Sequence, residues 1–274
     1  MRALQTICFS TVSVAGTGFR ALTAVAGDTA TFYNVPIGST AWLAEVWAVD
    51  NISAAEISIT ASRFHDQVYG MRGYVTSGAA TAPVLRPVCL SAIGFDQPIF
   101  PSDVLTVQAS AQTSDDVVVT MLVYYEELPG INARLASSAY VKANMKNLVG
   151  INVSTTAGDG LYGTPAALNS SDNRLHANTD YALLGFTAPL PLASCVISGI
   201  DTGNLRVGGP VLADPAIDAS MFVRYDVGYP QSGGLLPVIN SNNAGSTTIA
   251  TMGTDQTTGT VDVWLAELKQ PFTG

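Results

Sequence analysis

The chain has 274 residues, which is room for two domains of about 100 to 200 residues each. Only 12% of the residues are Asp, Glu, Lys or Arg, about half the usual share of roughly 25%, while 47% are hydrophobic. This composition excludes an intrinsically disordered chain. The net charge of −9 argues against a dedicated nucleic-acid binder, which needs an electropositive surface. We expect a globular protein whose surface is partly covered by copies of itself.

The first half of the chain begins with a segment that predicts a flexible arm. Residues 1–27 contain Arg2 and Arg20, no acidic residue, and the glycines of a GTGFRA sequence. Beyond the arm, apolar residues alternate with a period of two, which predicts half-buried strands separated by Gly, Pro, Asn, Asp and Ser turns. The strands expected in this half cover 29–35, 42–49, 55–62, and a hairpin formed by 103–112 and 114–128.

A different pattern follows Pro129-Gly130. From Ile131 to Val149 the apolar residues recur at roughly helical spacing without Pro or Gly, which predicts a helical linker over 130–150. No Asp or Glu occurs from Leu128 through Gly158, although Arg134, Lys142 and Lys146 do. With the arm, this linker forms the two local positive zones of an acidic protein.

The second half repeats features of the first. Expected strands cover 181–186, 221–229, 247–252 and 261–268. Thr40 and Thr179 begin similar aromatic strands at an offset of 139 residues, and the Glu-Leu pairs at 127–128 and 267–268 end similar strands at an offset of 140. The matching offsets favour a tandem duplication over chance similarity of hairpins, which remains the alternative. The expected fold class is all-β, with a first sandwich at 28–129 and a second at 151–274.

The chemistry-bearing residues form no recognisable catalytic motif. Cys8, Cys89 and Cys195 are widely separated, and His65 and His176 have no partner at metal-ligand spacing. Adjacent carboxylates such as Glu126 and Glu127 point to opposite faces of a strand, so they cannot act as a glycosidase pair. We therefore expect no enzyme activity and no cofactor.

Calcium is the one metal that loop acids at irregular spacing could bind. Solvated turn residues are the simpler interpretation of these acids, and structural calcium is the alternative. The candidate ligands are Asp115, Asp116, Asp201, Asp214 and Asp218.

Two tandem β-sandwiches joined by a short helical linker resemble the double jelly-roll major capsid proteins of icosahedral, membrane-containing, tailless bacteriophages. The resemblance rests on architecture, size and composition over about residues 28–270, because that family has little sequence signature. It implies a structural virion protein that is assembled in the host cytoplasm. It also implies pseudo-hexagonal homotrimers that tile a shell.

That resemblance further implies which residues face inward. Arg2, Arg20, Arg134, Lys142 and Lys146 would contact an internal membrane or the genome, without sequence-specific nucleic-acid binding. The partners it implies are copies of the chain itself, an internal membrane and minor capsid proteins. The alternative function is a two-domain β-sandwich binding module, such as a phage fibre, decoration or carbohydrate-binding protein.

Overall fold

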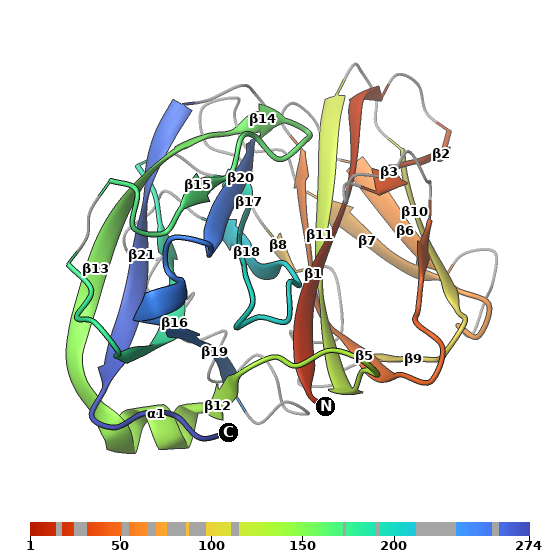
Figure 1. Ribbon diagram of the computed structural model, residues 1–274. Coiled ribbons are helices and arrows are strands. Elements are labelled where there is room, and N and C mark those ends of the chain that lie inside the picture. The colour runs from red at the N-terminus through yellow and green to blue at the C-terminus, as the bar shows by residue number, and fades with distance from the viewer. Residues whose placement is uncertain are drawn as a thin grey trace.

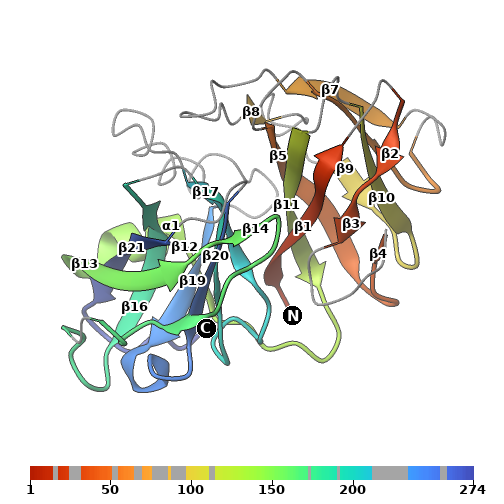
Figure 2. The ribbon, with the colours of Figure 1, turned by 90° about the horizontal axis from the view of Figure 1, so that it is seen from above.

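The protein is all-β, with a single α-helix among the residues that the structure describes. The structure is a computed structural model. It describes residues 1–14, 18–24, 32–50, 55–64, 70–75, 86–87, 97–110, 115–171, 174–189, 192–211, 234–253 and 258–274. Figures 1 and 2 show two β-sandwiches side by side, formed by a first half (residues 1–128) and a second half (131–274).

Two sheets make up the first half. One sheet, called the central sheet below, has the order β3-β1-β11-β5-β8, with β9 also pairing with β5. The other has the order β2-β10-β6-β7, with β4 also pairing with β10. The strands are β1 (Ala3–Val14), β2 (Arg20–Ala21), β3 (Thr23–Ala24), β4 (Tyr33–Asn34), β5 (Thr40–Asp50), β6 (Ala55–Thr60), β7 (Met71–Val75), β8 (Arg86–Pro87), β9 (Gln97–Ile99), β10 (Val104–Ser110) and β11 (Asp115–Glu127).

The second half also contains two sheets. Their orders are β12-β19-β16-β21-β13 and β14-β20-β17-β18, and β15 also pairs with β20. The elements are β12 (Leu135–Ser137), α1 (Ser138–Asn144), β13 (Met145–Thr156), β14 (Gly158–Asp159), β15 (Ala166–Ala167), β16 (Asp180–Thr187), β17 (Leu192–Ser198), β18 (Val207–Val211), β19 (Leu235–Asn240), a 3-10 turn (Ser241–Asn243), β20 (Thr248–Gly253) and β21 (Thr258–Leu268).

The two halves share one nested pattern of antiparallel pairs. In the first half β1 pairs with β11, β2 with β10, β5 with β9, and β6 with β7. In the second half β13 pairs with β21, β15 with β20, β16 with β19, and β17 with β18. The two halves therefore have the same order of nested strand pairs.

Most of the strands expected from the alternation form in the structure. The ranges 42–49, 55–62, 181–186, 247–252 and 261–268 correspond to β5, β6, β16, β20 and β21, and the hairpin to β10 and β11. In the range 29–35, the described strand is only β4, and the range 221–229 lies outside the described residues.

The N-terminal segment is the first departure from the sequence analysis. Where an arm over 1–27 is expected, Ala3–Val14 forms a 12-residue strand between β3 and β11 in the middle of the central sheet. Its inward side chains Ala3, Ile7 and Phe9 belong to the core of the first half. Its other face is also buried, so polar residues there do not indicate an exposed segment.

The linker is the second departure. The helix covers only Ser138–Asn144, within the helical range expected over 130–150, and Met145–Thr156 is a strand of the second half. In β13 the alternate residues Ile151 and Val153 are buried, while Met145 and Leu148 are exposed. The helical spacing in the sequence therefore groups residues that do not lie on one buried face in the structure.

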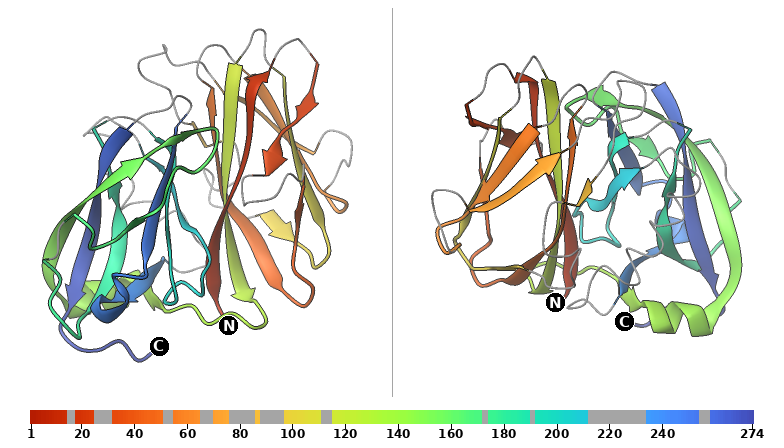
Figure 3. Two further views of the ribbon diagram at one scale, coloured as in Figure 1. Left: turned by 45° about the horizontal axis from the view of Figure 1, so that its top comes forward. Right: turned by 180° about the vertical axis from the view of Figure 1, so that it is seen from behind.

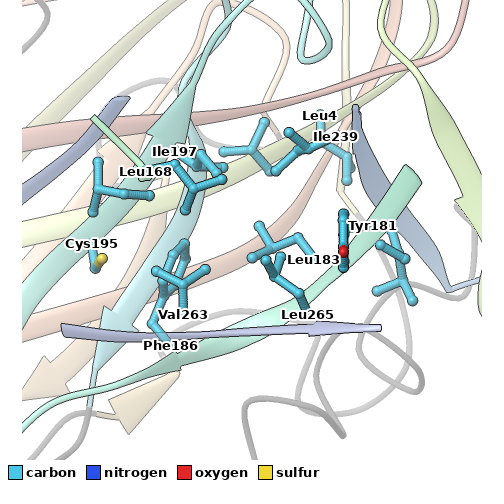
Figure 4. Close-up of a cluster of buried hydrophobic side chains, with 14 of the residues drawn as sticks. Leu4, Leu168, Tyr181, Leu183, Phe186, Cys195, Ile197, Ile239, Val263 and Leu265 are labelled. Atoms are coloured by element: carbon cyan, nitrogen blue, oxygen red, sulfur yellow. The ribbon is translucent and has the colours of Figure 1, made fainter. Parts of the chain in front are cut away.

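Both faces of the central sheet are covered. The side chains on one face of β1, β5 and β11 pack into the first sandwich, and those on the other face pack against the second half. Leu4, Leu122 and Tyr124 join the core cluster of the second half, where Figure 4 shows Leu4 near Ile239 and Ile197. A sheet buried on both faces needs nearly continuous apolar strands, which accounts for part of the low charge content.

Candidate functional site

The seam between the two halves contains buried polar groups that link them. The Thr6 hydroxyl donates to the carbonyl of Gly208 (2.8 Å) and accepts from its N–H (2.9 Å). The Ser10 hydroxyl donates to the carbonyl of Gly160, and the Thr120 hydroxyl donates to that of Ala193 (3.1 Å). These bonds satisfy backbone groups that water cannot reach, so they fix the register of one half against the other.

A buried thiol lies in the same seam. Cys8 Sγ is 3.0 Å from the Tyr162 hydroxyl, which is 2.9 Å from Ser194 Oγ. Burial raises the pKa of the Cys8 thiol and of the Tyr162 phenol. A protonated, buried thiol is a poor nucleophile, so this cluster suits packing and hydrogen bonding rather than covalent catalysis.

A cavity of about 300 Å³ adjoins the seam beside Tyr162. Val196 of β17 and Ala250 of β20 contribute to its lining, and the Arg206 guanidinium lies 4.7 Å from the centroid of the Tyr162 ring. The residues that line it include no carboxylate, imidazole or thiol. The cavity thus assembles no acid–base pair.

The five basic residues expected to face inward do not gather at one place. Arg20 is exposed on β2 in the first half, and Arg2 is exposed at the start of β1. Arg134, Lys142 and Lys146 follow the connection into the second half, and Figures 1 and 2 show α1 far from β2. Arg20 is therefore separated from the linker residues, whereas Arg2 follows Met1, whose carbonyl accepts from the Leu128 N–H (3.0 Å) at the start of the connection.

Arg134 is committed to an internal network instead of an outward contact. Its guanidinium donates to both carboxylate oxygens of Asp180 (2.9 Å each) and lies 3.5 Å from Asp201. Asn240 and the backbone N–H of Phe272 also donate to Asp180. Burial favours the neutral acid, but these hydrogen bonds and the Arg134 charge hold the pKa of Asp180 below its usual value. Arg134 ties the connection between the halves to the second sandwich.

A second buried carboxylate lies under Lys146. Glu267 accepts from Lys146 Nζ (2.9 Å) and from Asn147 Nδ2 (2.6 Å), and its Oε1 is 3.1 Å from His176 Nδ1. The hydrogen bonds from Lys146 and Asn147 lower the pKa of Glu267 to about 2. Sequence reasoning missed this cluster because 120 residues separate Glu267 from Asn147.

Helix α1, which directly precedes β13, carries a further lysine. Ser137 caps its N-terminus by accepting from the Tyr140 N–H, and Lys142 lies in its last turn. Past the end of β21, the Lys269 N–H donates to Asn144 O, and its Nζ to Ala143 O (3.3 Å). Cations near helix C-terminal carbonyls are favourable, which explains the placement of both lysines.

Two apolar side chains near the start of β13 are exposed. Met145 is 42% exposed and Leu148 is 56% exposed, both on the first half of β13. The structure thus confirms no inward orientation of the five basic residues.

Of the acids considered for calcium, only Asp201 has a side chain in the part of the chain that the structure describes. No group of three or more His, Cys, Asp or Glu residues there could hold a metal ion. Asp201 accepts from the Asn240 N–H and from Asn243 Nδ2 through one oxygen. Asp214 and Asp218 lie outside the described residues.

Comparisons with known proteins leave the family open. No family model matches the chain, and no curated protein matches it. Among solved structures it is similar to the PBSX exported protein XepA, at 8% sequence identity and a TM-score of 0.23, covering 95% of this chain and 86% of that one. A likeness this weak carries no argument about function. Among the described residues, no helix is long and apolar enough to cross a bilayer.

Proposed function

We propose that this chain is a structural virion protein, a double jelly-roll subunit of an icosahedral shell. The nested pairing of strands in both halves is the observation that carries this proposal. Jelly rolls consist of eight strands in two sheets, wound as Greek keys. The nested pairs β1·β11, β2·β10, β5·β9 and β6·β7, repeated in the second half, are compatible with such a rolled hairpin.

The fixed seam between the halves supports a building-block role. A shell subunit must present both sandwiches in one constant arrangement so that each copy tiles in the same way. The apolar contacts of Leu4, Leu122 and Tyr124 and the Thr6–Gly208 bonds provide such an arrangement. Function in this proposal is assembly through buried surface, without turnover, and the chain works in the virion after assembly in the host cytoplasm.

The proposed assembly is a homotrimer with a pseudo-hexagonal outline. Two similar sandwiches in each of three subunits present six similar edges, so one gene product can tile a curved shell. Permanent interfaces between such subunits are apolar, in keeping with a chain that is 12% charged.

Size-exclusion chromatography with light scattering, followed by negative-stain imaging, tests this proposal. We expect a particle of three times 28.5 kDa with six lobes in projection. A stable monomer that fails to trimerise over a range of protein concentrations and salts would overturn it. A monomer that binds glycans in an array would instead support the alternative, a two-domain binding module.

A further inference from the structure

The cavity beside Tyr162 has a floor of four side chains from two paired strands. The four are Val196 and Ser198 of β17 and their partners in register on β20, Ala250 and Thr248. Registered partners, and residues two positions apart on a strand, lie on the same face of a sheet, so these side chains form one surface. Val196 and Ala250 are buried. The Ser198–Thr248 pair is half-buried, so hydroxyls lie at the more exposed end of an apolar floor.

Arg206 brings the one charged side chain among the described residues that line the cavity. It directly precedes Val207, which pairs with Ile197, so it lies next to Ser198 at the hydroxyl end of the floor. Its guanidinium carbon lies over the Tyr162 ring, 4.7 Å from the centroid. Stacking uses the face of a guanidinium, whereas its five N–H donors point outward in its plane. A bidentate ligand needs only two of these donors, so it is compatible with the other interactions of Arg206.

The charge of the lining favours a monoanion. One guanidinium neutralises one negative charge, and the described lining residues supply no second cation. A phosphate monoester carries a charge of about −1.5 to −2 at neutral pH, so part of its charge would lack a partner. A carboxylate carries a single charge, and its two oxygens match the planar fork of an arginine. A carboxylate is thus the ligand group that Arg206 fits.

The rest of the lining favours an apolar body on that ligand. Val196, Ala250 and Pro165 contribute apolar side chains to the cavity. Binding sites for small molecules are mostly apolar with a few placed polar groups, and their volumes begin near about 300 Å³. This cavity has a volume of about 300 Å³. It therefore has room for a small ring or a branched chain, and not for a nucleotide or an oligosaccharide.

The cavity shares two residues with the seam between the halves. Tyr162 lines the cavity, while its hydroxyl lies 3.0 Å from Cys8 Sγ of β1. The Arg206 carbonyl accepts from the Thr6 N–H (2.7 Å). Figures 1 and 3 show β18 beside β1 and β11 at this seam. A ligand that packs against Tyr162 and Arg206 would therefore stabilise the joint between the halves.

We propose that this cavity binds a small carboxylate that carries an apolar ring or branched chain. Arg206 binds the carboxylate, and Val196, Ala250 and Pro165 enclose the apolar body. The inference goes beyond the shell proposal and does not depend on it, because the site lies within one chain and needs no second copy. Binding can therefore be measured whatever the oligomeric state.

Benzoate is the probe for this site, and benzamide is its neutral match. The two molecules have nearly the same shape, so the difference between them reports the carboxylate. Titration calorimetry on the full chain should give a dissociation constant of about 1 mM or lower for benzoate. Benzamide should bind at least about tenfold more weakly, because it lacks the charge-assisted hydrogen bonds. No binding of benzoate, or equal binding of both molecules, would overturn the proposal.

A thermal measurement supports the calorimetry. Benzoate should raise the melting temperature of the wild type in a concentration-dependent way, since a ligand that binds the folded state stabilises it. Benzamide at the same concentrations should raise it less. An equal rise with both would show that the carboxylate is not recognised, against the proposal.

Two variants locate the ligand in the cavity. Arg206→Gln removes the cation and should weaken benzoate binding at least about tenfold. Ala250→Leu places a larger side chain in the apolar floor and should abolish binding by filling the cavity. Benzoate binding that is unchanged in a folded form of either variant would place the ligand elsewhere and overturn the assignment. If one variant does not fold, the other variant and the comparison with benzamide still decide.

Matched substitutions away from the cavity serve as controls. Arg72→Gln removes another arginine that lies over an aromatic ring, with its guanidinium carbon 4.8 Å from the Phe19 centroid. Ala177→Leu enlarges an exposed alanine. Both controls should bind benzoate as the wild type does, and thermal unfolding without ligand shows that each variant is folded. Equal losses of binding in the controls and in the test variants would contradict the site.

The outcomes are distinguishable from those of the proposed function. A trimer that does not bind benzoate would overturn the carboxylate site and leave the shell proposal standing. A monomer that binds benzoate through Arg206 would overturn the shell proposal and leave the carboxylate site standing.

Discussion

Thr6 and Gly208 exchange two hydrogen bonds although 202 residues separate them in the chain. The Thr6 hydroxyl both donates to and accepts from the backbone of Gly208, and the Thr6 N–H donates to the neighbouring Arg206 carbonyl at 2.7 Å. One small side chain on β1 thereby satisfies both backbone groups of one residue of β18. The contact joins the two halves at a point where both strands are buried.

Replacing Thr6 with Val should destabilise the protein by about 2–3 kcal/mol. The valine keeps the shape but leaves the Gly208 N–H and carbonyl buried without these partners, and each such group costs about 1–3 kcal/mol. Urea unfolding measures the free energy of unfolding. Thr40→Val, at an exposed position, is the control and should change it by less than about 0.5 kcal/mol. Equal effects of the two substitutions would contradict the seam contact.

Gly208 and Gly209 should differ sharply in their tolerance of alanine. A Cβ at Gly208 would lie 1.9 Å from the Cys195 carbonyl oxygen, whereas a Cβ at Gly209 would meet nothing within 4 Å. Gly208→Ala must therefore separate β17 from β18, and we expect a loss of about 3 kcal/mol. Gly209→Ala should stay within about 1 kcal/mol of the wild type. Comparable melting temperatures for the two variants would show that β18 does not pair as described.

Arg134→Gln should cost about 2 kcal/mol or more. It leaves Asp180 and Asp201 buried near each other without their cation, and breaking a buried pair in this way is strongly destabilising. Arg72→Gln breaks the exposed pair with Glu56 (3.2 Å) and should cost less than about 1 kcal/mol. Chemical denaturation of both variants checks the contrast, and a larger loss for Arg72→Gln would contradict it.

Glu267 should make stability depend on pH in acid. Its folded pKa of about 2 lies below the ordinary 4.5, so the unfolded chain binds the proton first as the pH falls. The stabilisation from Glu267 is complete above about pH 4.5 and is lost as the pH falls towards 2. The free energies of unfolding of the wild type and Glu267→Gln should therefore converge over this window. Parallel pH profiles would show that Glu267 is not held as an anion.

The reactivity of the two described cysteines should report on the unfolding of two different parts of the protein. Cys8 and Cys195 are buried, and burial raises the pKa of each thiol, so both should react slowly with a maleimide in the native state at pH 8. Cys8 lies in the seam and Cys195 in the core of the second half. If the halves part before either unfolds, peptide mass spectrometry will find Cys8 modified at lower urea than Cys195. Simultaneous modification would indicate a single cooperative transition.

Much of the fold follows from local patterning. The strands β5, β10, β11, β16, β20 and β21 alternate strongly or carry β-branched and aromatic runs, and the sequence predicts them. The Glu-Leu ending shared by the last strands of the two halves also predicts a repeat. Local signals suffice where a strand has one buried face or two fully apolar faces.

Strand β1 could not be predicted because its environment is not local. The glycines of GTGFRA and the absence of acids predict an arm over 1–27, yet Thr6, Cys8 and Ser10 face the second half and bond to it. A polar residue that bonds across a seam looks the same in sequence as one that faces water. The polar residues of β1 can be explained only when the position of the second half is known.

The surroundings of the basic residues also cannot be predicted from the local sequence. Arg134 and Lys146 stand in a stretch without acids, which predicts free positive charge. Folding brings Asp180 and Glu267 to them from 46 and 121 residues away. The sequence places Met145 and Leu148 in the expected helix, whereas in the structure both are exposed residues of β13.

The doubly covered central sheet means that the two sandwiches are not interchangeable modules. Cutting the chain between Leu128 and Arg134 would release a first half with Leu4, Leu122 and Tyr124 facing solvent. Such a fragment would self-associate through that face, so truncation or swapping of either half in an engineered particle needs compensating polar substitutions on β1 and β11.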